Sequence, residues 1–87
     1  MIFFKTKYFM ITTLNKLKQK ESGIIVDIKA DKKLKTKLLI MGLTNGTRIT
    51  LNKIAPLGDP FDIIVRHYHL LIRAKEAKSI VINKYEL

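Results

Sequence analysis

The chain lacks cysteine and tryptophan and has no long uninterrupted apolar run. Without cysteine it cannot form disulfides, thiolate zinc sites or a cysteine nucleophile, which is consistent with a reducing compartment. Its most apolar stretch, residues 1–11, is interrupted by Lys5 and Lys7 and is far shorter than the roughly 20 residues of a membrane-spanning helix. The stretch also lacks the small-residue cleavage site of a signal peptide. We therefore expect a cytoplasmic protein, with the inner face of the cell membrane as one place it could act.

Residues 1–11 are predicted to form an N-terminal extension or an added edge segment. The segment is rich in aromatic side chains, namely Phe3, Phe4, Tyr8 and Phe9. These side chains could dock on the domain or dip into a lipid interface. A packed or poorly ordered arm is the simpler interpretation.

Acidic residues are few, with 7 Asp+Glu against 17 Lys+Arg and a formal net charge of +10. No two of them are spaced as a pair for general acid–base catalysis, and neither Ser22 nor Ser79 lies in a nucleophile motif. No phosphate-binding glycine motif occurs either. We expect no enzymatic activity and no cofactor. The positive charge favours an anionic partner, which could be an acidic protein, an anionic membrane surface or a nucleic acid.

Short runs of alternating apolar residues dominate the rest of the chain, whose 87 residues are 47% hydrophobic. About five short strands are predicted, the last at residues 80–82, with tight turns between most of them. The side chains expected to face the core are Ile24, Val26, Ile28, Ile49, Leu51, Phe61, Ile63, Val65, Leu70 and Ile72. Strands of this length and spacing indicate a mainly β protein and a small closed barrel, since closure protects sheet edges.

One short α-helix is predicted after the first strand. Asp31 is a candidate N-cap, and Leu34, Leu38 and Met41 form one apolar stripe. Gly42 stands where a helix ends in a left-handed residue, and Leu43 would then pack back on Leu38. Before the first strand, Thr13 is predicted to cap a short helical turn that contains Leu14 and Leu17.

The sequence "APLGDP" at residues 55–60 contains both prolines of the chain. Pro56 and Pro60 fix the backbone and end the neighbouring strands, while Gly58 permits a positive φ. Asp59 can accept a hydrogen bond from a backbone N–H. We expect a stiff loop that presents Leu57 outward, either as a simple corner or as a corner that is also a recognition surface.

His67 and His69 are weak candidates for a metal site. Two residues apart on a strand, they would project to the same face, and Asp62 could approach across the hairpin. No cysteine is available as a further ligand. At a hairpin tip, two solvated histidines are the simpler interpretation, so no metal site is assigned.

These features, in this order, resemble the FeoA family, the small cytosolic component of bacterial ferrous iron transport. The resemblance rests on "MGL" at residues 41–43, Gly46, the hexapeptide at 55–60, "IR" at 72–73 and "EA" at 76–77. It implies an SH3-like β-barrel over residues 12–82, followed by a tail at 83–87. It also implies a partner, the large membrane ferrous iron transporter with a cytosolic GTP-binding domain, and no agreed enzymatic activity.

The chain departs from the family pattern at several positions. Lys20 replaces a glycine before the first strand, His67 replaces a glycine in the hairpin turn, and Ile40 replaces an acidic residue before Met41. His67 leaves the type of that turn open, because a side chain disfavours positive φ. Ile40 would enlarge an apolar patch on the exposed side of the helix.

We expect an accessory or regulatory protein that binds the transporter through Leu57, Gly58, Asp59 and Pro60, together with Ile40 and Met41. The lysines of the helix and of residues 16–20 could form a solvated face or lie against anionic lipid headgroups. The alternative is a basic SH3-like module that binds nucleic acid, which we rank lower because few aromatic residues are interleaved with the basic ones. A homo-oligomer is also compatible with the sequence.

Overall fold

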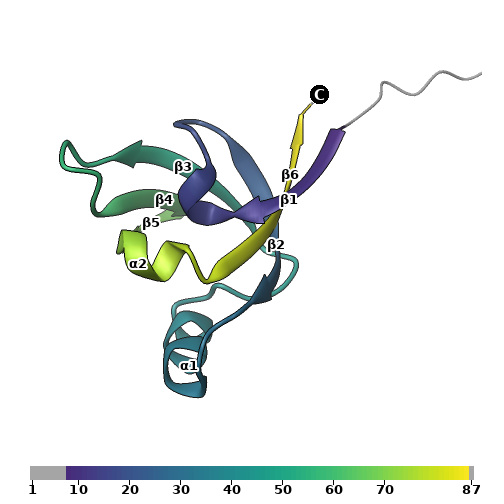
Figure 1. The fold of residues 1–87 in the computed structure, drawn as a ribbon, viewed down its shortest axis with the longest axis vertical. Coiled ribbons are helices and arrows are strands. Elements are labelled where there is room, and N and C mark those ends of the chain that lie inside the picture. Colours follow the sequence, from purple (N-terminus) through teal and green to yellow (C-terminus); the bar gives the residue numbers. More distant parts are fainter. Residues whose placement is uncertain (1–7, 87) are drawn as a thin grey trace, which may run out of the picture.

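Alternating side chains produce a six-stranded antiparallel sheet in the computed structural model, which describes residues 8–86 (Figure 1). The strands are β1 (Tyr8–Thr13), β2 (Ser22–Ile28), β3 (Arg48–Ile54), β4 (Phe61–Val65), β5 (Tyr68–Ile72) and β6 (Ile80–Glu86). The helices are α1 (Lys32–Ile40), α2 (Ala74–Ala77) and the 3-10 turn η1 (Leu14–Lys16). The predicted mainly β class is confirmed. Within the described residues, no helix is both long and apolar enough to cross a membrane.

The sheet is not closed, contrary to the barrel expected from the sequence. Its strand order is β1-β6-β2-β3-β4-β5, so that β1 and β5 are the two edges of the described part of the chain. Irregular registers at residues 25–27 of β2 and 51–53 of β3 interrupt the ladders. Such bulges bend strands and increase twist. The sheet therefore curls around its core without its two edge strands pairing.

The sixth strand, β1, lies partly in the segment predicted to be an extension or an added edge. It pairs with β6 from Tyr8 opposite Glu86 to Thr13 opposite Val81. These paired strands extend beyond residues 12 and 82, the two domain boundaries expected from the sequence. Phe3 and Phe4, which we considered for docking or lipid contact, lie outside the described residues.

Strand β2 does not bury all of the side chains expected of it. Ile28 is buried as predicted, but Val26 is exposed and Ile24 only half-buried, while Ile25 is fully buried. The irregular register between Ile25 and Asp27 explains the difference, because one extra residue reverses the faces of the strand on either side of it. The prediction was therefore wrong for Ile24 and Val26.

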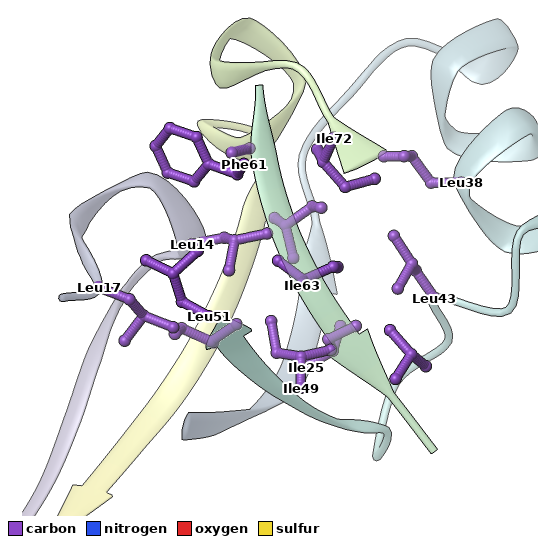
Figure 2. Packing of buried hydrophobic residues seen from close by; sticks show 14 of the residues in the cluster. Leu14, Leu17, Ile25, Leu38, Leu43, Ile49, Leu51, Phe61, Ile63 and Ile72 are labelled. Carbon is purple, nitrogen blue, oxygen red and sulfur yellow. The ribbon is translucent and has the colours of Figure 1, made fainter. Parts of the chain in front are cut away.

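The remaining strands bury the predicted side chains. Ile49 and Leu51 of β3 meet Ile63 of β4 in a cluster that Leu14 and Leu17 close from the side of η1 (Figure 2). Phe61, Val65 and Ile72 are also buried, and Leu70 packs against this cluster. Burial of each such side chain contributes on the order of 1.5–3 kcal/mol, which makes this cluster the main source of stability.

Helix α1 begins and ends as predicted. Asp31 Oδ1 accepts a hydrogen bond from the Leu34 N–H at 2.9 Å. At the other end Gly42 has a φ of +95°, the Leu43 N–H donates to the Leu38 carbonyl at 3.0 Å, and Leu43 is fully buried. This is the Schellman arrangement, which holds α1 against the core at its last turn.

Candidate interaction surfaces

The proline-bounded loop presents Leu57 to solvent. Leu57 is 96% exposed at the tip of the β3–β4 hairpin. The Gly58 N–H donates to the Ala55 carbonyl at 2.8 Å, and the Ala55 N–H donates to the Pro60 carbonyl at 3.1 Å. Gly58 takes a φ of +86°, as the sequence suggested. The outward Leu57 is thus confirmed, and it stands on a backbone with internal hydrogen bonds.

Asp59 fixes this loop to a distant part of the chain. Its Oδ1 accepts a hydrogen bond from the Ala74 N–H at 2.9 Å, and Ala74 is the first residue of α2. The sequence predicted a hydrogen bond from a backbone N–H but could not identify the donor. The first N–H groups of a helix have no hydrogen-bond partner within the helix. The Asp59 carboxylate accepts from one of these groups in α2 and thereby holds the loop against the helix.

A second apolar surface lies at the end of α1. Ile40 is 80% exposed, as expected from its place on the wet side of the helix, and Leu39 beside it is also exposed. Met41 is half-buried and packs against the core. The Tyr68 hydroxyl donates to the Met41 carbonyl at 3.2 Å and so joins this end of α1 to strand β5.

The structure separates the two surfaces that the sequence analysis grouped together. The β3–β4 loop with Leu57 and the helix α1 with Ile40 lie at different ends of the molecule (Figure 1). Helix α2 lies between them, since its Ala74 bonds Asp59 of the loop and its Glu76 bonds Lys37 of α1. We therefore treat them as independent candidate contacts.

The two histidines are placed differently from each other. His67 lies in the turn between β4 and β5, whereas His69 lies on β5 with its Nδ1 2.9 Å from Asp62 Oδ1. In the turn it is Arg66, and not His67, that takes the positive φ, of 54°. Among the side chains that the structure describes, no group of three or more from His, Cys, Asp or Glu is arranged to hold a metal ion.

Asp62 is the centre of a hydrogen-bonded chain on the outer side of the sheet. Lys20 Nζ donates to Asn52 Oδ1 at 2.7 Å, and Asn52 Nδ2 donates to Asp62 Oδ2 at 2.9 Å. The hydrogen bonds of Asp62 with Asn52, the largest influence, and with His69 lower the pKa of Asp62 below its ordinary value. The Asp62 carboxylate is thus hydrogen-bonded to neighbours within the chain.

The other acidic side chains that the structure describes are also hydrogen-bonded within the chain. Every acidic side chain except that of Glu86, which the structure does not describe, accepts a hydrogen bond within the chain: Glu21, Asp27, Asp31, Asp59, Asp62 and Glu76. Glu76 links α2 to α1, because it bonds the Arg73 N–H at 3.2 Å and Lys37 Nζ at 2.7 Å. Most of the positive charge is consequently left to face solvent or a partner.

A polar groove of about 600 Å³ was not foreseen from the sequence. It lies between the turn before β3 and the turn after β4, and its lining is Thr44, Asn45, Gly46, Thr47, Arg48, Thr50, Ile64 and Arg66. The signal available in the sequence was "TNGTRIT" at residues 44–50, in which Arg48 and Thr50 alternate with the buried Thr47 and Ile49. Only the register of β3 with β4 brings Arg66 to the same place.

The family model of the FeoA domain matches residues 12–84 of the chain. The chain belongs to the FeoA family. A FeoA-like protein of Clostridium acetobutylicum is 33% identical, with a TM-score of 0.77 over 83% of this chain and 84% of its own. Iron(II) transport protein A of Clostridium thermocellum is 27% identical, with a TM-score of 0.80 over 84% of this chain and 45% of its own. No curated protein sequence matches the chain.

A more distant FeoA supports the fold. The FeoA of Stenotrophomonas maltophilia, an SH3 domain protein solved with zinc, is 23% identical, with a TM-score of 0.71 over 82% of this chain and 88% of its own. The SH3-like class expected from the family resemblance is therefore confirmed. Lys20, which the sequence analysis noted as a departure from glycine, takes a φ of 73°, a conformation that glycine adopts more easily.

Proposed function

We propose that this FeoA protein is a cytoplasmic, non-enzymatic accessory of ferrous iron uptake that acts by binding the membrane ferrous iron transporter. Family membership links the chain to ferrous iron transport. The observation that supports a binding role is the nearly complete exposure of Leu57 on a loop whose ends are fixed by hydrogen bonds. A rigid apolar projection loses little entropy when a partner covers it.

The end of α1 is the second proposed contact. Ile40 and Leu39 are exposed next to a helix whose other exposed side chains are mostly lysines. An apolar centre with a polar rim is the usual composition of a protein–protein interface. Gly58, Asp59 and Pro60 shape the loop for one contact, and Met41, which packs against the core next to Ile40 in sequence, belongs to the other.

The test is a binding measurement between the full chain and the cytosolic part of the transporter. We expect at least one of the variants Leu57→Asp and Ile40→Asp to weaken binding by about tenfold or more. The new carboxylate would be buried where the partner contacts the chain. Ile11→Asp is the matched control, since Ile11 is also an exposed apolar residue but lies on edge strand β1. Wild-type affinity in both Leu57→Asp and Ile40→Asp would contradict the proposed surfaces, and no binding by the wild type would refute the function itself.

The rival function is polyanion binding, which the net charge of +10 favours. Nucleic acid binding of this kind falls steeply as salt rises. A mobility shift with double-stranded DNA at low salt decides between the two. We expect weak retardation without sequence preference and no competition with the transporter.

A further inference from the structure

We propose that the groove between the turn at residues 44–47 and the β4–β5 turn binds an acidic peptide segment of the partner protein. The inference rests on the proposed function, because it names the chemistry by which a partner would be recognised. The groove is separate from both apolar surfaces, and no acidic residue lines it. Its volume of about 600 Å³ is large enough for several residues of an extended chain.

Arg66 is the residue on which this assignment depends. The side chain is exposed, and among the side chains that the structure describes, residues 10–84, no hydrogen bond or ion pair engages its guanidinium group. A guanidinium group can bind a carboxylate through two parallel hydrogen bonds, which provides orientation as well as attraction. Arg66 therefore supplies a directional site for an Asp or Glu side chain.

The backbone at Arg66 is in a conformation that arginine disfavours. Its φ of 54° lies in the left-handed region, where the Cβ of a non-glycine residue crowds the backbone. A glycine would fit this turn better, so the arginine is not explained by the fold. Strained residues concentrate at functional sites, where the side chain is needed for another purpose.

Hydroxyl groups complete the groove. Thr44 Oγ1 lies 2.9 Å from Thr47 Oγ1, and Thr50 Oγ1 lies 2.7 Å from Ser22 Oγ. When Thr44 accepts from Thr47 and Thr50 accepts from Ser22, the hydroxyl hydrogens of Thr44 and Thr50 are left for an outside partner. These donors are suited to the carbonyl and carboxylate oxygens of a peptide.

The experiment measures binding of a fluorescein-labelled hexaglutamate peptide to the full chain by fluorescence anisotropy. Arg66→Gly removes the guanidinium group and relieves the strained turn, so we expect a more stable protein that binds the peptide about fivefold or more weakly. Retained affinity in Arg66→Gly would overturn the proposal. A loss of binding together with unchanged or raised thermal stability would support it, because misfolding could not be the cause.

Lys20→Gly is the matched control. Lys20 is the other non-glycine residue with a positive φ in the described chain, so the change removes the same charge and the same kind of strain outside the groove. We expect affinity within about twofold of wild type. Equal weakening by both variants would show attraction by net charge alone, and displacement of the peptide by an equal concentration of inorganic phosphate would show a phosphate site. Either result would refute the peptide site.

The experiments distinguish failure of the acidic-peptide site from failure of the proposed transporter binding. If hexaglutamate does not bind but the transporter still does, only the acidic-peptide site is wrong. If the peptide binds through Arg66 and the transporter does not bind, the site stands and the proposed partner is wrong. NMR spectra recorded with and without hexaglutamate would locate the site independently, since we expect the shifted amide resonances to lie at residues 44–50 and 64–66.

Discussion

Glycine is required at position 42 for two reasons, its backbone conformation and the space around it. Its φ of +95° ends α1, and a Cβ added there would lie 2.5 Å from the Tyr68 hydroxyl oxygen. Gly46 has a similar φ of +89°, but nothing lies within 4 Å of the place of its Cβ. The two glycines therefore separate the cost of backbone conformation from the cost of a steric clash.

We expect Gly42→Ala to lower the free energy of unfolding by about 2–3 kcal/mol and Gly46→Ala by only about 1 kcal/mol, because the second change affects φ alone. Urea denaturation measures both values. Adding Tyr68→Phe, which removes the clashing oxygen, is expected to recover part of the loss in Gly42→Ala. Equal destabilisation by Gly42→Ala and Gly46→Ala would show that Tyr68 moves away from the new Cβ at no cost in free energy.

At the scale of elements, Glu76 joins the two α-helices. The hydrogen bond from Lys37, the largest influence, lowers the pKa of Glu76 below its ordinary value of 4.5. A carboxyl group with a lowered pKa in the folded state stabilises the protein above its unfolded-state pKa, and this contribution is lost as pH falls through the folded-state pKa. Glu21 and Asp62, whose pKa values are lowered by Lys84 and Asn52 respectively, act in the same direction.

Stability is therefore expected to decline as pH falls below about 4.5, and Glu76→Gln is expected to make this decline shallower. At neutral pH the same variant should cost about 1 kcal/mol, because one charge-assisted hydrogen bond is weakened. A double-mutant cycle with Lys37→Met, followed by urea denaturation at pH 7 and at about pH 3, measures the coupling. A coupling energy near zero at pH 7, or one that grows as pH falls, would contradict the assigned ion pair.

At the scale of the whole molecule, unbalanced charge is the dominant feature. The described acidic side chains are engaged inside the fold, and the net charge is +10. Repulsion among the remaining cations disfavours the compact state, and salt screens it. This is also the physical reason why an acidic partner segment would be bound more readily than a neutral one.

We expect the melting temperature to rise by a few degrees, roughly 2–5 °C, between about 10 mM and 200 mM sodium chloride. Lys33→Glu, on the exposed side of α1, should raise the melting temperature at low salt and reduce its salt dependence. Lys33→Gln is the control for loss of the charge without reversal. A melting temperature that falls with salt would show that the internal ion pairs outweigh the repulsion.

The sequence by itself determined the local elements, because their causes are local. Asp31 and Gly42 set the ends of α1, the prolines and Gly58 shape the outward loop, and the apolar residues at every second position of 49–51 and 61–65 identify β3 and β4. It failed at β2, where Val26 was expected inside, because a bulge depends on the partner strand and leaves no mark in the alternation.

Tertiary structure alone decided what depends on distant pairing. It left the sheet open with β1 at one edge, joined Asp59 to the start of α2, and separated Leu57 from Ile40. It also brought Arg66 beside the threonines of the preceding turn. Strand register and helix docking bring together residues far apart in the chain, and the pattern within any single segment does not contain that information.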